Sequence, residues 1–211
     1  MSGIEAAALA AMFARIADAV ETEKGRLCEL DGVIGDADHG IAMALGFAAA
    51  RDAAAKAVAT PADVLTAAGK AFLNAVGASS GPLYATAMLE AAKSVRGETS
   101  LTDDQAIGLI SAFAAGIARR GKAVLGDKTM LDAWGPAAEA AEKARAETAG
   151  VATGYAAALA AAEAGAAATT TMVARLGRAA RLGDRALGHI DPGAASAVIV
   201  LRAMGESLAD V

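Results

Sequence analysis

The sequence predicts an all-α protein, an eight-helix up-and-down antiparallel bundle or barrel. Hydrophobic residues make up 55% of the chain, but 63 residues are alanine and only 3% are aromatic. Alanine is the strongest helix former, and its small side chain lets neighbouring helices pack closely. Apolar residues recur at helical spacing in segment after segment, and no run alternates convincingly as a strand would.

Helical spacing and one start signal define the elements of the first half of the chain. Met12, Ile16 and Val20 fall on one face of a helix, which predicts the first element. Thr60 precedes Pro61, the arrangement of an N-cap residue followed by a first-turn proline. This pair predicts the start of the third helix.

Two further start signals lie in the second half of the chain. Thr102 and Gln105 have the spacing of a capping box, and Asp191 followed by Pro192 predicts the start of the last helix. Together, the patterns predict helices at 4–29, 39–55, 62–76, 81–95, 103–121, 129–147, 153–176 and 192–208.

Glycine, aspartate and serine interrupt the helical pattern in four places. These interruptions are residues 31–40, 77–82, 121–128 and 177–193. Short connections favour antiparallel neighbours, so alternate loops should gather at one end of the bundle. We therefore expect one domain over residues 1–211, with a ligand site built from these loops.

The composition of the chain limits which partners and which cellular location we expect. The chain has 19 Lys+Arg against 24 Asp+Glu, a net charge of −5, which argues against nucleic acid as a partner. The alanine-rich stretch after Tyr155 is a poor membrane span, and the N-terminus lacks the pattern of a signal peptide. Cys28 is the single cysteine, which excludes a disulfide framework within the chain. We expect a cytoplasmic protein that does not bind membranes.

A cluster of carboxylates is the first candidate site. Asp31, Asp36 and Asp38 lie within eight residues, beside His39 and flanked by glycines. Clustered carboxylates repel one another unless cations neutralise them, and hard oxygen ligands suit Mg²⁺ or Ca²⁺. An EF-hand starting at Asp36 is excluded because it would need a glutamate at Phe47. We interpret the cluster as a metal site; helix capping and turn formation are the alternative.

Two other segments could contribute to a phosphate site, and a third, residues 121–130, is interpreted as a glycine-terminated helix followed by an Asp or Thr cap. Residues 77–82 read GASSGP before an apolar helix, which fits an anion site or a plain helix-helix turn with a serine cap. Residues 121–130 read as a loop ending at a helix start. The most basic part of the chain contains Arg175, Arg178, Arg181 and Arg185. These arginines could stabilise a phosphoryl group, or Arg175 and Arg178 could lie on the solvated face of a helix end.

Four motifs in order carry a resemblance to a known family. IGDADHG, GASSGPLYAT, GDKTMLDAW and GHIDPGAAS closely resemble the L subunits of dihydroxyacetone kinases, over essentially the whole chain. The resemblance implies an eight-helix barrel with a nucleotide site at one end. It also implies two Mg²⁺ ions on Asp31, Asp36 and Asp38, bound to ADP or ATP, with Arg178 as the catalytic residue.

The same resemblance implies the nucleotide contacts. The implied residues are His39, Gly40, Ile41, Ala42, Ser79, Ser80, Gly121, Met130, Arg178, Asp191, Pro192 and Gly193. Ala42 departs from the family, which usually carries asparagine there. Losing one neutral hydrogen bond costs about 0.5–1.5 kcal/mol, so we expect weakened nucleotide binding.

The resemblance implies a subunit that is inactive alone. The expected function is to carry Mg-ADP or Mg-ATP and pass phosphate to dihydroxyacetone held on a separate K subunit. A phosphocarrier M subunit of the phosphotransferase system would rephosphorylate the nucleotide. One alternative is an ATP-dependent kinase subunit for another short ketose, such as erythrulose. The other is an ADP-loaded regulatory binding protein.

Overall fold

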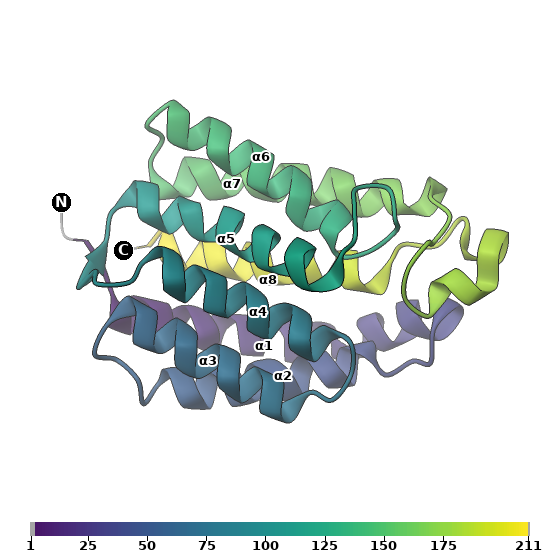
Figure 1. Cartoon of the computed structure of the whole chain (residues 1–211), viewed down its shortest axis with the longest axis horizontal. Helices are drawn as coiled ribbons and strands as arrows, with labels where there is room; N and C mark the ends of the chain where they lie inside the picture. The colour runs from purple at the N-terminus through teal and green to yellow at the C-terminus, as the bar shows by residue number, and fades with distance from the viewer. Residues whose placement is uncertain (1–2, 211) are drawn as a thin grey trace.

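A computed structural model describes residues 3–210 and confirms the all-α architecture (Figure 1). Within these residues the α-helices are α1 (Ala6–Ile34), α2 (His39–Ala54), α3 (Pro61–Ala75), α4 (Ser80–Ser94), α5 (Asp103–Gly121), α6 (Leu131–Ala146), α7 (Val151–Ala168) and α8 (Pro192–Leu208). Each helix packs against its neighbours in sequence, and α8 packs against α1, which closes the ring. Short antiparallel connections thus produce an up-and-down barrel.

Local capping sets several of the helix starts. The Thr60 side chain accepts a hydrogen bond from the backbone of Asp63, and Thr102 and Gln105 form the complete capping box. The Asp191 carboxylate accepts from the backbone N–H of Ala194 at 2.8 Å. All three start signals expected from the sequence are therefore confirmed. Such caps satisfy backbone donors that have no partner inside the helix.

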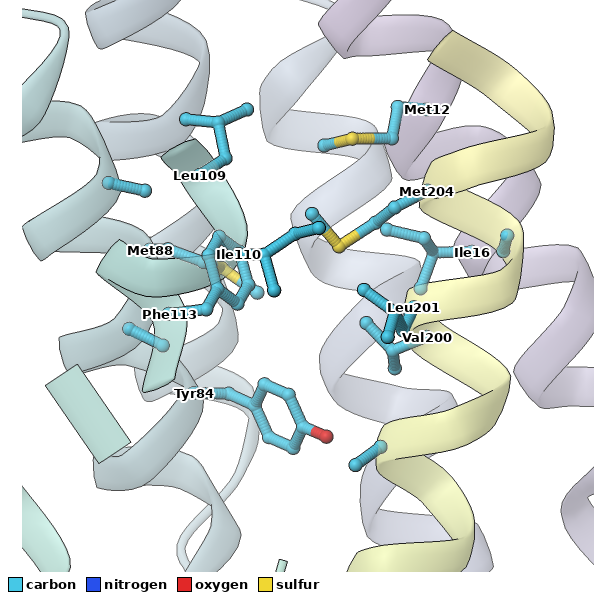
Figure 2. Packing of buried hydrophobic residues seen from close by; sticks show 14 of the residues in the cluster. Met12, Ile16, Tyr84, Met88, Leu109, Ile110, Phe113, Val200, Leu201 and Met204 are labelled. Carbon is cyan, nitrogen blue, oxygen red and sulfur yellow. The ribbon is translucent and has the colours of Figure 1, made fainter. Parts of the chain in front are cut away.

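Large side chains fill the barrel, although aromatic residues are scarce. Figure 2 shows apolar side chains from α1, α4, α5 and α8 meeting in the interior, with Ile110 and Met204 close to the centre. In the same core, the rings of Phe47, Phe72 and Tyr84 pack together with centroids 5.0–5.6 Å apart. Small residues bring the helix backbones together: a Cβ on Gly116 of α5 would lie 2.6 Å from the Cα of Ala87 in α4.

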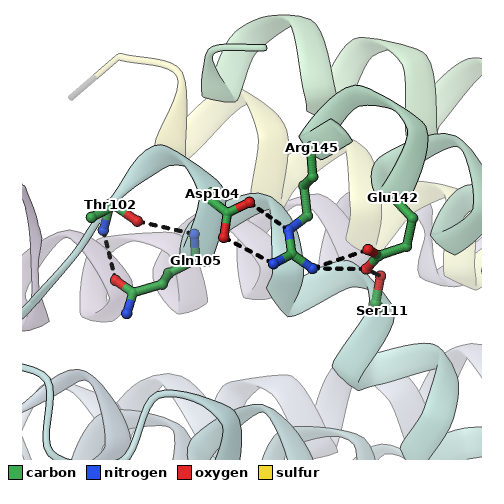
Figure 3. A network of polar contacts seen from close by, with 6 residues as sticks. All are labelled: Thr102, Asp104, Gln105, Ser111, Glu142 and Arg145. Atoms are coloured by element: carbon green, nitrogen blue, oxygen red, sulfur yellow. Dashed lines mark hydrogen bonds and ion pairs between the residues drawn. The ribbon is translucent and has the colours of Figure 1, made fainter. Parts of the chain in front are cut away.

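A polar network on the surface joins α5 to α6. The Arg145 guanidinium donates to both carboxylate oxygens of Asp104 at 2.8 Å and also contacts Glu142 (Figure 3). This two-pronged contact holds the pKa of Asp104 below its usual value, since the hydrogen bonds favour the ionised carboxylate. The network lies close to the capping box, so the start of α5 is fixed by both.

The expected bounds of the first helix were wrong at both ends. The first helix was expected to end at residue 29, but α1 continues to Ile34 and so carries Asp31 in its last turn. Residues 4 and 5, expected at the helix start, instead form β1 (Ile4–Glu5), which pairs antiparallel with β2 (Ser100–Leu101). The backbone here finds its partners in a distant segment, which no local pattern indicates.

The helix expected over 153–176 also ends early, at Ala168. The hydroxyls of Thr169, Thr170 and Thr171 each donate to the carbonyl three residues before, and the chain tightens there into a 3-10 turn, η1 (Thr169–Thr171). Such side-chain bonds give the backbone carbonyls an alternative to helical hydrogen bonding. Threonine is also β-branched, which lowers its preference for the helix. Arg175 and Arg178 therefore do not lie on a helix face, and the expectation that they could was wrong.

Among residues 3–210, no helix combines the length and the apolar character needed to cross a membrane.

Candidate functional site

Four helices begin at the same end of the barrel, on the right in Figure 1. They are α2, α4, α6 and α8, because in an up-and-down barrel alternate helices point the same way. The N-terminus of a helix presents free N–H groups and the positive end of its dipole. This end of the molecule is therefore suited to bind an anion.

A pocket of about 480 Å³ opens among these helix starts. The structure brings nearly all the site residues expected from the sequence to its walls: Asp31, Asp36, Asp38, His39, Ala42, Ser79, Ser80, Gly121, Met130, Arg178, Asp191, Pro192 and Gly193. The exceptions are Gly40 and Ile41. Gly40 is buried against the α1 backbone at Lys24, and Ile41 is exposed. The four loops interrupted by glycine, serine and aspartate thus meet in space.

The acidic cluster, by which we mean Asp31, Asp36 and Asp38, is compact. One carboxylate oxygen from each residue lies within 4.8 Å of the others. Asp31 is buried, whereas the side chains of Asp36 and Asp38 are about half exposed, at 46% and 48%. Three oxygen donors at this separation fit a hard divalent cation such as Mg²⁺, which takes carboxylate ligands and keeps several waters.

Asp31 also builds the loop that carries the other two carboxylates. Its Oδ2 accepts hydrogen bonds from the backbone N–H groups of Asp38 at 3.0 Å and His39 at 3.3 Å. Ala37 has a φ of 64°, so the chain turns sharply between Asp36 and Asp38. A carboxylate near the C-terminus of α1 is unfavourable toward that helix dipole. The two backbone donors at the start of α2 offset that cost.

Arg178 faces the acidic cluster from a distant segment. Its guanidinium contacts the Asp36 carboxylate and lies 3.7 Å from Asp38. Residues 170–188 form an irregular segment that starts within η1, precedes α8 and includes the 3-10 turn η2 (Ala179–Ala186). Arg178 lies in this segment, which places a positive charge beside the acidic cluster. A second arginine of this segment, Arg175, lies 3.8 Å from Asp127.

Buried polar groups underlie the pocket. The Ser80 hydroxyl lines the pocket and is buried, yet it has no hydrogen-bond partner among residues 3–210. A buried polar atom without a partner is unfavourable, so a ligand in the pocket would satisfy it. His39 Nε2 lies 2.9 Å from the hydroxyl of Ser196, and burial lowers the pKa of the His39 imidazole. Burial therefore favours the neutral form of the His39 imidazole.

Two ionisable groups are buried behind the pocket wall. Burial raises the pKa of Asp191 to about 7, although Lys128 and the N–H groups at the start of α8 oppose this shift. Lys128 is only 1% exposed, and its ammonium donates to the carbonyls of Thr169 at 2.5 Å and His189 at 2.6 Å. Burial lowers the pKa of Lys128, while Asp191 and Asp132 raise it.

Lys128 is a pocket residue that the sequence reasoning missed. It stands in the motif GDKTMLDAW, but a lysine in a loop is normally exposed, and only the three-dimensional fold buries it. Asp132, one turn into the same motif, accepts from the backbone N–H groups of Gly126 and Thr129 and so shapes the loop around Lys128.

The arrangement can hold a cation and an anion together. The acidic cluster supplies oxygen ligands, while the starts of α4 and α8, with Ser80 and Arg178, favour negative charge. A ligand bearing phosphates together with a divalent metal satisfies both halves of the pocket.

Comparison with known proteins agrees with this chemistry. The family model described as the DAK2 domain matches residues 33–206. The ADP-binding subunit DhaL of a PEP-dependent dihydroxyacetone kinase of Listeria innocua is 37% identical over 192 residues, covering 90% of this chain and 88% of that protein. The corresponding Escherichia coli subunit is 39% identical, covering 89% of this chain and 90% of that protein.

Two larger kinases match over part of their length. An L-erythrulose 1-kinase of Mycolicibacterium smegmatis is 41% identical, covering 89% of this chain but 33% of that protein. The crystal structure of the dihydroxyacetone kinase from C. freundii in complex with AMP-PNP and Mg²⁺ is 24% identical, with a TM-score of 0.72. It covers 98% of this chain, which spans 35% of that kinase chain, and it supports the fold.

Proposed function

The chain belongs to the DAK2-domain family, and from this premise we propose that it is the ADP-binding L subunit of a dihydroxyacetone kinase. In this role it binds ADP or ATP with two Mg²⁺ ions and passes phosphate to a short ketose held on a K subunit. The observation that carries the proposal is the meeting of Asp31, Asp36, Asp38 and Arg178 beside four helix starts in one pocket.

Each half of the pocket has a part in the proposed reaction. Asp31, Asp36 and Asp38 would hold the two Mg²⁺ ions, which neutralise phosphate charge when bound. The starts of α4 and α8 present backbone N–H groups to the phosphates, and Met130 at the pocket wall packs against the base.

Arg178 is the catalytic residue of the proposal. Its guanidinium already lies against Asp36 and Asp38, so it is within reach of any phosphoryl group bound at the acidic cluster. A planar guanidinium donates two parallel hydrogen bonds to phosphate oxygens and stabilises the charge that develops during transfer.

The ketose and the phosphoryl donor form the finer part of the proposal. The relatives named as ADP-binding subunits of PEP-dependent kinases support a resident ADP that a phosphocarrier M subunit rephosphorylates. A specific observation favours a second candidate, an ATP-dependent erythrulose kinase, because the L-erythrulose 1-kinase shares 41% identity in the matched region. In both cases the ketose lies outside this chain, on the K subunit or its equivalent.

Reconstitution tests the proposal. The chain is combined with a K subunit, with either an M subunit and its phosphoryl source or free ATP, and with dihydroxyacetone or erythrulose. We expect Asp36→Ala to abolish turnover while circular dichroism stays unchanged, since Asp36 is exposed and makes no cap. The matched control is Asp52→Ala, an exposed aspartate near the end of α2, which should retain full activity. Activity that survives Asp36→Ala would overturn the assignment.

The nucleotide content of the purified protein separates the two donors. After extensive dialysis with Mg²⁺ and denaturation, close to one ADP released per chain supports the phosphocarrier. A protein free of nucleotide supports either exchangeable ATP or a site weakened at Ala42.

A further inference from the structure

The 170–188 segment, which carries Arg178, leaves the barrel and returns to it at nearly the same place. The backbone N–H of Gly188 donates to the carbonyl of Thr170 at 2.7 Å, so the two ends of the segment are adjacent. Just outside that contact, the ammonium of Lys128 donates to the carbonyls of both Thr169 and His189. One side chain from a different loop thus joins the two flanks of the segment.

We propose that Lys128 is a positioning residue that closes the base of the 170–188 segment and so holds Arg178 over the acidic cluster. The catalytic consequence rests on the proposed function, but the clamp itself does not. Lys128 lines the pocket beside Asp191. Within residues 3–210 it forms no ion pair with Asp36 or Asp38, which pair with Arg178 instead. Lys128 therefore acts through the segment.

Apart from the ion pairs that Arg178 makes with Asp36 and Asp38, the segment has few apolar contacts with the barrel. It contains three glycines with positive φ, Gly177, Gly183 and Gly188, which leave the backbone free to adopt other conformations. Its own apolar contacts form a small cluster in which three alanines, Ala174, Ala179 and Ala186, and the partly buried Leu182 pack against Ile34 of α1. Alanine side chains bury little apolar surface, so this cluster contributes only weakly to fixing the segment.

The loop that carries Lys128 makes the other firm contact. The backbone N–H of Arg175 donates to the carbonyl of Asp127 at 3.1 Å, one residue before Lys128. Residues 127 and 128 therefore contact the segment and its flanks at four points: two through the Lys128 ammonium, one through the Asp127 carbonyl and one through the Asp127–Arg175 ion pair. Burial of an ammonium is unfavourable unless partners compensate, and here two carbonyls and the nearby carboxylates of Asp132 and Asp191 do so.

The proposal separates catalysis from nucleotide binding. Of the expected nucleotide contacts, only Arg178 lies in the segment, and the others lie outside it, mostly at the starts of α2, α4, α6 and α8. Loss of the clamp should therefore lower kcat at least about tenfold through misplacement of Arg178, while the Kd for Mg-ADP changes less than about threefold. If Lys128 were only structural, its loss would lower the stability of the fold and would not lower kcat selectively relative to nucleotide binding.

Limited proteolysis of the free chain tests the clamp directly. The segment contains Arg175, Arg178, Arg181 and Arg185, so trypsin reports its opening, with cleavage sites located by mass spectrometry. We expect Lys128→Met to speed cleavage within the segment at least about tenfold and Lys128→Arg, which keeps a charged donor, to restore most of the protection. The matched control is Lys122→Met, because Lys122 lies in the same loop with a φ of 56°, close to the 61° of Lys128, but is exposed.

The outcomes are distinct for the clamp and for the proposed function. Unchanged cleavage in Lys128→Met overturns the clamp, whatever the protein catalyses. Faster cleavage confined to the segment, with a wild-type chain that transfers no phosphate, supports the clamp and refutes the proposed function. Faster cleavage with an unchanged kcat overturns the positioning role. If Lys128→Met does not fold, Lys128→Gln, which keeps two N–H donors at a shorter reach, carries the same comparison.

Discussion

Substitution of Asp191 should change how the stability of the protein depends on pH. Asp191 is buried at the start of α8, where its carboxylate accepts from the Ala194 N–H at 2.8 Å. Burial raises its pKa from the ordinary 3.8 to about 7. The folded protein therefore keeps a proton that the unfolded chain releases above about pH 4.

The sign and size of the Asp191 effect on stability follow from the linkage between protonation and folding. A group that holds its proton more tightly in the folded state stabilises the fold most below its unfolded pKa, and this contribution is lost as the pH rises through the folded pKa. Each unit of difference corresponds to about 1.4 kcal/mol, so the rise from 3.8 to about 7 amounts to about 4 kcal/mol. The loss falls between about pH 4 and pH 7.

Asp191→Asn isolates this contribution because asparagine keeps an oxygen that can accept the Ala194 N–H. Urea unfolding of both proteins would be followed between about pH 4 and pH 8, in chelator and without nucleotide. We expect the stability of the wild type relative to Asp191→Asn to fall by about 4 kcal/mol over this range. A difference that stays constant with pH would refute the reasoning, since it would mean that Asp191 titrates alike in the folded and unfolded chains.

Three further predictions concern stability and can be measured by urea unfolding in chelator. Asp31→Ala should cost about 1–2 kcal/mol because two backbone N–H groups lose their acceptor, whereas Asp36→Ala should stay within about 0.5 kcal/mol; equal costs would contradict this. Gly116→Ala should cost about 1–3 kcal/mol through a clash with the α4 backbone. Gly25→Ala, whose Cβ would meet nothing within 4 Å in the described chain, should raise the free energy of unfolding by about 0.5–1 kcal/mol. If both glycine substitutions changed stability in the same direction, the close packing at Gly116 would be contradicted. Thr102→Ala should cost about 1 kcal/mol by removing the capping box, and an unchanged midpoint would show that the cap contributes nothing.

Most of the fold could be predicted because helix signals act over three or four residues. The capping pairs at Thr60 and Thr102 marked helix starts correctly, and the helices over 103–121 and 192–208 have the expected bounds. The antiparallel order of neighbours then predicted that alternate loops meet at one end, which the pocket confirms. The boundaries that failed were those decided by competing bonds, as at Thr169 to Thr171, or by a distant partner, as at Ile4.

The candidate site was likewise predicted in part from the sequence and in part not. The sequence indicated which loops carry carboxylates, serines and arginines, since residue type and spacing alone suggest ligands for cations and anions. It did not indicate that Asp31 belongs to α1 and shapes the loop after it, because that role depends on hydrogen bonds with the start of the next helix.

By itself, the sequence determined an all-α chain, the order of its helices and the residue types that could bind metal and phosphate. Only the tertiary structure decided which of these residues face one another. Arg178 meets Asp36 across the mouth of the pocket, and Lys128 bonds a carbonyl that is 61 residues away in the chain. The physical reason is that burial and long-range pairing depend on how the helices close into a ring. Local propensity, which sequence patterns report, acts within single turns.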